Sequence, residues 1–283
     1  MSLRTPIDLD AIRRRHPHHF GRPSRERQLI LGAAALALLL GGMAEFGFFG
    51  RQLVDGIGKL GVIAGLMMPP NPGDWAHVRL YAMSLVETVA ISFLGTLGAS
   101  ILAIPLALLA ARNVTTQRVL RFLSRRSLDT IRSIDILIWA LIWINVVGLG
   151  PFAGVLAIMT SDIGNFGKLF SEAIEAADRR PVEGIVSTGG GRILGIRFGI
   201  LPEVFPVLAS QVLYFFESNT RSATIIGIVG AGGIGLHLAE AIRTLELRQS
   251  SFIILIILVA VAAIDLVSNQ LRFALIGRRG PVA

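Results

Sequence analysis

The sequence predicts an all-α integral membrane protein with six transmembrane helices and both termini in the cytoplasm. Of its 283 residues, 53% are hydrophobic and only 16% are charged, whereas a soluble domain carries about 25% charged residues. The apolar residues come in long blocks, and a helix needs about 20 such residues to cross the bilayer core. The basic residues lie mainly on one side of these blocks. This composition disfavours a soluble enzyme, a disordered chain and a disulfide-stapled secreted domain.

Six apolar blocks supply the predicted spans. They run from Leu29 to about Phe49, from about Leu85 to Ala111, from about Ile134 to Val147, from about Phe152 to Phe170, from about Val204 to Phe216 and from Phe252 to Leu271. The fourth block is weaker than the others because Ser161 and Asp162 lie near its middle. A further apolar stretch, Ala223 to Leu238, is too short and too rich in glycine to count as a span.

The distribution of basic residues predicts the orientation. Most of the 27 Lys and Arg residues precede the first block, follow the second, lie between the fourth and fifth, or follow the sixth. Cytoplasmic segments of membrane proteins carry an excess of Lys and Arg, so both termini are expected in the cytoplasm. The net charge of +8 is then explained by topology. The N-terminal basic arm is read as a solvated segment touching anionic lipid, and its histidines, His16, His18 and His19, are not expected to bind metal.

Two absences narrow the chemistry further. The chain has no cysteine, which excludes disulfides, thiolate metal sites and cysteine nucleophiles. It also lacks the Gly-x-x-x-x-Gly-Lys-Ser/Thr loop that cradles nucleotide phosphates, since Gly167-Lys168 is followed by Leu169. We expect no catalytic residue in this chain. Any ATP-driven step requires a separate subunit that binds ATP and Mg²⁺.

The longest polar segment inside the bundle lies between the fourth and fifth blocks. The helical pattern of the fourth block continues through Glu175 and stops near Asp178. A second, short helix is predicted to begin at Pro181, because proline suits the first turn of a helix, and to end near Thr188, before the glycines 189–191. By itself this pattern fits a plain connecting loop and a docking helix equally well.

The residues of this segment resemble a cytoplasmic motif of permeases from binding-protein-dependent ABC importers. In that family Glu-Ala-Ala is followed by three residues, Gly, nine residues and Ile-x-Leu-Pro. Glu183, Gly189, Leu201 and Pro202 match this spacing, while Gly184 stands in place of the first alanine. The second alanine and the isoleucine are also replaced.

The resemblance implies that the short helix docks in a groove of an ATPase subunit. Glu183 would supply a charge for docking, Gly189 would permit a sharp turn, and Leu201-Pro202 would set the entry into the fifth span. The alternative is that Glu183 is only solvated and Pro202 only begins a helix. Glu175-Ala176-Ala177 resembles the motif by letters but fits the spacing less well.

A glycine run before the last span has the spacing of a dinucleotide-binding turn. Gly230, Gly232 and Gly235 satisfy Gly-x-Gly-x-x-Gly, but such a turn opens a βαβ unit of about 30 residues, and here a span begins at Phe252. We therefore expect no dinucleotide there and no membrane oxidoreductase. The alternative is a bend that lets backbones pack closely or line a pathway, since irregular backbone at membrane depth needs protein or water around it.

This region resembles the phosphonate-transporter permeases in particular. The residues that carry the resemblance are Glu217, Asn219, Arg221 and Thr224, followed by Val-Gly-Ala-Gly-Gly-Ile-Gly at 229–235. The resemblance implies a five-span permease core with one additional N-terminal helix. The expected organisation is a basic cytoplasmic arm at 1–28, the first transmembrane helix and an external loop at 29–84, the ABC importer permease core at 85–271, and a cytoplasmic tail at 272–283.

An anionic phosphonate that crosses a membrane needs fixed donors and positive charge. The Arg221 guanidinium can bind phosphonate oxygens in a bidentate manner, and nearby hydroxyls and glycine N–H groups can complete the shell. The alternative is that Arg221 reaches the membrane interface or pairs with Glu217. The candidate pathway residues are Asn219, Thr220, Arg221, Ser222, Thr224, Gly230, Gly232 and Gly233.

Several acids lie within or beside the spans: Glu45, Glu87, Asp135, Asp162 and Asp265. Ionisable groups inside a membrane are functional candidates, and an ion-coupled secondary transporter using Asp162 or Asp265 is the rival interpretation. A row of carboxylates is a poor lining for an anion pathway, however. We interpret these acids mainly as hydrogen-bond partners between helices.

The resulting hypothesis is a permease subunit of an ATP-driven ABC importer in a bacterial inner membrane. The substrate class is expected to be phosphonates, or else phosphate or phosphite. The expected partners are a cytoplasmic ATPase dimer, an external substrate-binding protein, a second and identical permease copy, and lipid, but no nucleic acid. The chain itself is expected to bind no cofactor and no metal.

Overall fold

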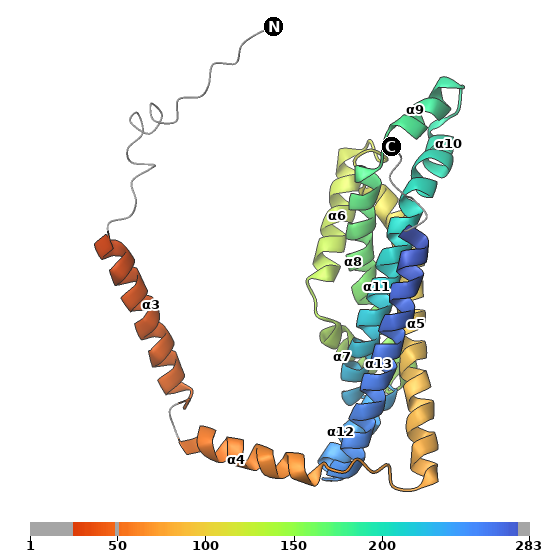
Figure 1. Cartoon of the computed structure of the whole chain (residues 1–283). Helices are drawn as coiled ribbons and strands as arrows, with labels where there is room; N and C mark the ends of the chain where they lie inside the picture. Colours follow the sequence, from red (N-terminus) through yellow and green to blue (C-terminus); the bar gives the residue numbers. More distant parts are fainter. Residues whose placement is uncertain (1–24, 49–50, 277–283) are drawn as a thin grey trace. The chain divides into compact units, whose positions relative to one another are not determined.

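The computed structural model describes residues 25–48 and 51–276 of the chain (Figure 1). Most of the predicted basic arm, including its three histidines, and most of the predicted tail lie outside the described residues. All regular structure in the described part is helical, with no strand. The chain divides into two units, Met1–Gly65 and Leu66–Ala283.

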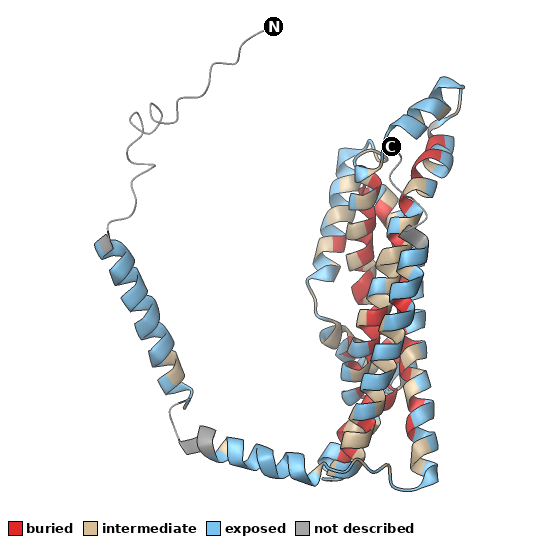
Figure 2. Ribbon diagram, viewed as in Figure 1, coloured by how far each residue is buried: buried red, intermediate tan, exposed pale blue. Residues whose placement is uncertain are grey.

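The first unit contains two helices, α3 (Arg25–Glu45) and α4 (Arg51–Leu66). Helix α3 has the length and composition of a membrane span and is almost entirely exposed (Figure 2). Its leucines cover its surface without a polar face, which is typical of a helix surrounded by lipid. Helix α4 lies in a segment for which the sequence predicted only an external loop.

The second unit is a bundle of helices. Its elements are α5 (Trp75–Ala110), α6 (Arg118–Arg132), α7 (Ile136–Val147), α8 (Pro151–Ala176), α9 (Arg180–Ser187), α10 (Arg192–Leu194), the π-helical turn η1 (Gly195–Ile200), α11 (Leu201–Ile228), α12 (Ile234–Arg243) and α13 (Leu247–Ile276). Helix α9 lies at one end of the bundle and α12 at the other (Figure 1). We refer to these as the α9 end and the α12 end.

Helices α5 and α8 form the centre of this bundle. Small residues recur at every fourth position of α5, at Gly95, Ala99, Ala103 and Ala107, and such spacing lets helix backbones approach closely in membranes. A Cβ atom at Gly95 would lie 2.7 Å from the side chain of Ile158 in α8. Buried Phe and Ile side chains of α8 complete this core (Figure 2).

Four helical segments of the described chain are long and apolar enough to cross a membrane. They are α3, α5, the segment from Gly195 to Ile228, and α13. The pair α6 and α7, bent by 89° at residues 133–135, counts as a fifth if it is taken as one broken span. The predicted fourth block corresponds to α8, whose polar residues reduce its hydropathy. The exact number of six spans stays a prediction.

The predicted fifth span is too short. The structure has one continuous helical run, in which η1 passes directly into α11 and α11 extends to Ile228. The run therefore continues twelve residues beyond the predicted end at Phe216. As a result, Asn219, Arg221 and Thr224 lie inside a helix of the bundle and not in a connection beside it.

Candidate functional site

The short helix predicted at Pro181 is present as α9. It begins at Arg180, ends at Ser187, and is followed by Gly189 with a φ of +84°, the left-handed conformation that favours glycine. The N–H of Gly190 donates to the carbonyl of Ile185 at 3.0 Å, as expected for a glycine-terminated helix.

Helix α9 packs on the π-helical turn η1 through a valine and two glycines. A Cβ at Gly199 would lie 2.9 Å from Val182 Cγ2, and one at Gly195 would lie 3.2 Å from Val182 Cγ1. These two glycines therefore accept the Val182 side chain at close range. Gly199 is the position at which the family motif has isoleucine, so the departure from the motif has a local packing reason.

The other face of α9 is free in this chain. Glu183, Gly184 and Val186 are exposed, and α9 has no buried residue. Exposed apolar side chains continue beyond it at Ile193 and Phe198. This end of the bundle thus presents a short helix with an exposed carboxylate beside apolar groups, a combination suited to docking against another protein.

The remaining motif residues lie where this helix joins the bundle. Leu201 and Pro202 form the first turn of α11, and Glu203 Oε1 in the same turn accepts the N–H of Asp178 at 2.9 Å. Glu175 instead ends α8, where its carboxylate accepts the N–H of Arg112 at 2.6 Å and pairs with Arg125. Glu175 therefore belongs to the closure of the bundle and not to α9.

The glycine run forms a tight connection between α11 and α12. Gly230, Gly232 and Gly233 are buried and have φ values of +104°, +85° and +75°. Their backbones pack against α5 and the start of α8: the N–H of Gly233 donates to Glu87 Oε1 at 3.2 Å, and the N–H of Gly150 donates to the Gly230 carbonyl at 3.0 Å.

There is no room for larger residues in this connection. A Cβ at Gly233 would lie 2.3 Å from Thr88 Oγ1, and one at Gly235 would lie 2.0 Å from the Thr224 carbonyl oxygen. The Thr88 hydroxyl also accepts the N–H of Ile234 at 2.8 Å. Apart from a nucleotide site, the sequence left two interpretations of the glycine run: close packing of backbones or the lining of a pathway. Close packing accounts for each of these contacts.

The middle of the bundle contains a buried polar cluster, which we call the Asn219 cluster (Asp162, Asn219, Thr96 and Asn165). Asn219 of α11 donates to Thr96 of α5 at 2.8 Å and to Asp162 of α8 at 2.5 Å. Asn165 donates to the same carboxylate at 3.3 Å. Asn219 is 5% exposed and Asp162 is 2% exposed. This is the interhelical role expected for the acids, because polar groups in a bilayer must find partners inside the protein.

A second polar cluster, the Glu217 cluster (Glu217, Arg221 and Arg272), lies on the opposite face of α11. Arg221 donates to Glu217 Oε1 at 3.2 Å, and Arg272 of α13 donates to Glu217 Oε2 at 2.8 Å. The Glu217 side chain is 10% exposed and the Arg221 side chain is 50% exposed. Sequence reasoning identified Arg221 and its pairing with Glu217 but assigned Arg272 to the cytoplasmic tail.

The other predicted pathway residues of α11 have local partners. The hydroxyl of Thr220 lies 3.2 Å from that of Ser92 in α5. The hydroxyls of Ser222 and Thr224 donate to carbonyls one turn earlier in α11, at 3.4 and 3.3 Å. The structure thus divides the candidate pathway residues into a buried connection, a buried cluster and a half-exposed ionic cluster.

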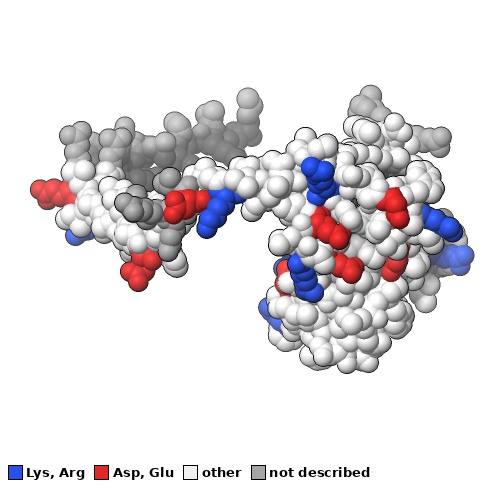
Figure 3. Space-filling view, turned by 90° about the horizontal axis from the view of Figure 1, so that it is seen from below, with Lys and Arg blue, Asp and Glu red and all other residues white. Residues whose placement is uncertain are grey.

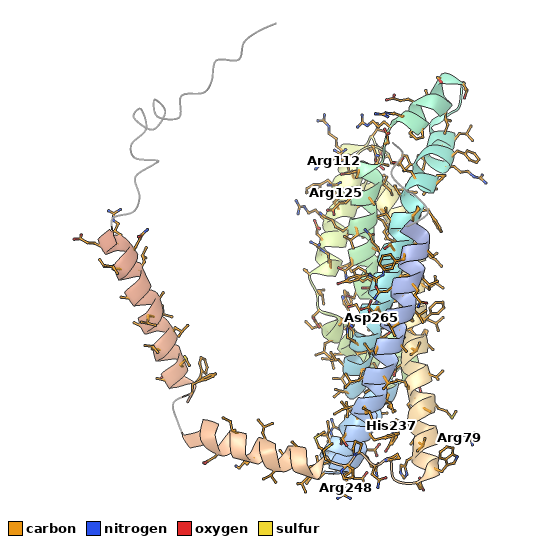
Figure 4. The ribbon with its side chains drawn as sticks, in the orientation of Figure 1. Arg79, Arg112, Arg125, His237, Arg248 and Asp265 are labelled. Atoms are coloured by element: carbon orange, nitrogen blue, oxygen red, sulfur yellow. The ribbon has the colours of Figure 1, made fainter. Side chains whose placement is uncertain are left out.

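Basic side chains lie at both ends of the second unit. Arg112 and Arg125 lie at the α9 end, whereas Arg79, His237 and Arg248 lie at the α12 end, with Asp265 of α13 between them (Figure 4). Seen from the α12 end, acidic side chains gather near the middle of the bundle with basic ones around them (Figure 3).

A polar cavity of about 270 Å³ opens at the α12 end. It is lined by residues that include His77, Tyr81, His237, Glu240 and Glu246. Just before α5, the pKa of Asp74 is lowered because its carboxylate accepts the backbone N–H of His77. Among the described residues, no group of three or more His, Asp or Glu side chains is placed to hold a metal ion.

Comparison with known proteins identifies relatives of this chain. Residues 103–279 match the family model described as "Binding-protein-dependent transport system inner membrane component". The phosphite transport system permease protein PtxC of Stutzerimonas stutzeri is 33% identical over 86% of this chain and 86% of its own length. The phosphate-import permease protein PhnE of Mycolicibacterium smegmatis is 39% identical over 74% of this chain and 39% of its own length.

A solved structure has the same fold. An inward-facing conformation of the methionine ABC transporter MetNI matches with a TM-score of 0.61, at 17% identity, over 72% of this chain and 99% of the matched one. The family match, residues 103–279, begins in the last turns of α5 and extends through α13.

Proposed function

The chain belongs to the family of binding-protein-dependent transport system inner membrane components, and from this premise we propose that it imports phosphonates or the related oxyanions phosphite and phosphate. It is a multi-pass inner membrane protein and the permease subunit of an ABC importer. The observation that carries the oxyanion class is that its relatives are named for phosphite and phosphate transport. The choice of phosphonates rests on the resemblance of residues 217–235 to phosphonate-transporter permeases. We infer that an external binding protein delivers the anion and that a separate ATPase dimer hydrolyses ATP.

The proposed topology has six spans, with the α9 end and both termini in the cytoplasm. The basic residues support this orientation, because the connection between α5 and α6 and the first turns of α6 carry several arginines at the α9 end (Figure 4), and cytoplasmic segments are enriched in such residues. In this arrangement residues 1–28 form a cytoplasmic arm, 29–84 the first span with its external segment and 85–271 most of the permease core. Because α13 continues to Ile276, Arg272 belongs to the bundle, and the predicted tail at 272–283 begins inside this helix.

Helix α9 is the proposed coupling element. Its support is the exposed Glu183 beside exposed apolar groups, on a helix that contacts the bundle through Val182 and η1. Motion of an ATPase subunit bound to α9 would pass through η1 into α11, since these two elements are continuous. The shape of the helix and of its junction with the bundle would depend on Gly184, Gly189, Leu201 and Pro202. The bundle would then open alternately to the two sides of the membrane.

A reversed charge tests the coupling assignment. Glu183→Lys should abolish uptake while the protein still inserts in the membrane, because only an exposed docking charge changes. The matched control is Glu172→Lys, at an exposed position on α8 that pairs with Lys168. Full transport by Glu183→Lys would contradict the assignment.

The partner subunits are tested by purification. The tagged chain would be isolated from its native cells in mild detergent, and the proteins that accompany it identified by mass spectrometry. A stoichiometric ATPase subunit and two permease copies are expected, together with ATP-dependent uptake of methylphosphonate in proteoliposomes. A chain that is recovered alone and transports without ATP would favour the secondary transporter that uses Asp162 or Asp265.

A further inference from the structure

The depth of the Glu217 cluster follows from contacts on the other face of α11. Asn219 bonds to Thr96 and Thr220 lies against Ser92, and both α5 residues lie near the middle of the 36-residue helix α5. Glu217 is less than one turn from Asn219 along α11. The Glu217 cluster is therefore inside the apolar zone of the bundle and not at its edge.

The charge in this cluster is unbalanced. Two guanidinium groups share one carboxylate, and no other carboxylate in the described part of the chain forms an ion pair with Arg221 or Arg272. Arg272 also lies over the ring of Tyr214, 5.9 Å from its centroid, and its Nε is buried without a hydrogen-bond partner. One positive charge is left without a carboxylate, and one buried donor, Arg272 Nε, is left without an acceptor.

Contact with lipid does not account for this arrangement. The Arg221 side chain is half exposed, yet an arginine at the depth of the bilayer core is costly unless it faces water or protein. Arginines near the end of a span can reach the interface with their side chains. Arg221 does the opposite, because its Nη2 lies 3.2 Å from Glu217, one turn nearer the middle of α11. This face of α11 and α13 must border a water-filled path or a second subunit.

We propose that Arg221 and Arg272 together form the anion-selective site of the transport pathway, with Glu217 as their shared counter-ion. This inference rests on the proposed function. A phosphonate presents tetrahedral oxygens and negative charge, which guanidinium groups bind through paired charge-assisted hydrogen bonds. Arg272, whose side chain is 24% exposed, contributes the second positive charge, and Arg221 contributes the exposed guanidinium edge.

Glu217 has two effects in such a site. It holds both guanidiniums at fixed positions between α11 and α13, and it competes with the anion for their donors. Transport requires binding that is favourable enough for entry but weak enough for release. The carboxylate therefore limits the affinity of the site, while the excess positive charge keeps the site selective for anions.

The test uses the permease with its ATPase in lipid nanodiscs and radiolabelled methylphosphonate at equilibrium. Glu217→Gln removes the competitor and should bind methylphosphonate about tenfold more tightly than the wild-type complex, whereas Arg272→Gln should bind about tenfold more weakly. If the cluster were purely structural, the two substitutions would not be expected to change the affinity for methylphosphonate in opposite directions. Arg248→Gln, an exposed arginine at the start of α13, is the matched control and should leave binding unchanged.

Import completes the test. In proteoliposomes with saturating, substrate-loaded binding protein, Arg272→Gln should reduce the methylphosphonate imported per ATP hydrolysed by about tenfold, and Arg272→Lys should recover part of it. If the complex with Arg272→Gln does not assemble, binding and import by the Arg272→Lys and Glu217→Gln complexes test the inference instead. Unchanged binding and import in the assembled variants would overturn the inference. Failure of the wild-type complex to import methylphosphonate, phosphite and phosphate alike would instead overturn the proposed function.

Discussion

Helix α11 carries two polar clusters within the same turns, and they differ in what satisfies them. Asn219 bonds to Thr96 of α5 and to Asp162 of α8, and these three residues are buried between α5, α8 and α11. Around Glu217, two arginines share one carboxylate and Arg221 remains half exposed. A polar group that is completely partnered and buried holds helices together, whereas excess charge that is exposed at the same depth requires something from outside the chain.

The sharpest test of this comparison is chemical access to adjacent positions. The chain has no cysteine, so single cysteines can be introduced without background from this subunit. We expect Arg221→Cys to react with an anionic, membrane-impermeant thiosulfonate in the assembled transporter, and Thr220→Cys, which is buried beside Ser92, to remain unmodified. Equal labelling of both positions would remove the distinction between the two faces.

The largest effect on stability is expected in the Asn219 cluster. Asn219→Leu leaves the Asp162 carboxylate buried with only the 3.3 Å bond from Asn165, and a buried group that loses its hydrogen-bond partner costs about 1–3 kcal/mol. Unfolding of the purified protein by SDS titration in detergent measures the change. Asn145→Leu is the control, because the exposed Asn145 bonds only to its own helix; an equal loss in that variant would show that the effect is not specific to the cluster.

The Glu217 cluster should behave in the opposite way. Arg221→Gln removes the exposed guanidinium and should lower the rate of phosphonate import by about tenfold, while Glu217 keeps its bond to Arg272, so that the free energy of unfolding falls by less than about 1 kcal/mol. Uptake and SDS titration on the same preparation check both parts. A variant that loses stability but imports normally would place Arg221 with the structural residues.

The smallest effect is expected from the hydroxyl pair between α5 and α11. Thr220→Val removes the contact with Ser92 at 3.2 Å, and hydrogen bonds between helices in a membrane contribute about 0.6 kcal/mol on average. Uptake should be unchanged and the shift in SDS titration small. A loss as large as that of Asn219→Leu would mean that the two buried contacts act as one unit.

The extent of successful prediction differs along the chain for a physical reason. The short helix α9, its glycine termination and the junction at Leu201-Pro202 could be predicted because proline and glycine act locally on the backbone. The apolar blocks predicted the positions of α3, α5, α8, α11 and α13, since hydropathy is a property of each segment. The length of α11 was missed because Ser, Thr and Arg lower the hydropathy of a segment whose partners lie elsewhere. Helix α4 was missed because Asp55, Lys59 and several glycines interrupt its apolar residues.

By itself, the sequence determined a helical membrane protein of the ABC importer permease class and the position of the short helix α9. The orientation in the membrane stays a prediction. Only the tertiary structure decided that the glycine run packs against Glu87 and Thr88, that Asn219 is buried with Asp162, and that Arg272 reaches Glu217. These pairings depend on the register between helices that are distant in sequence. No local pattern encodes that register, because it results from packing the whole bundle at once.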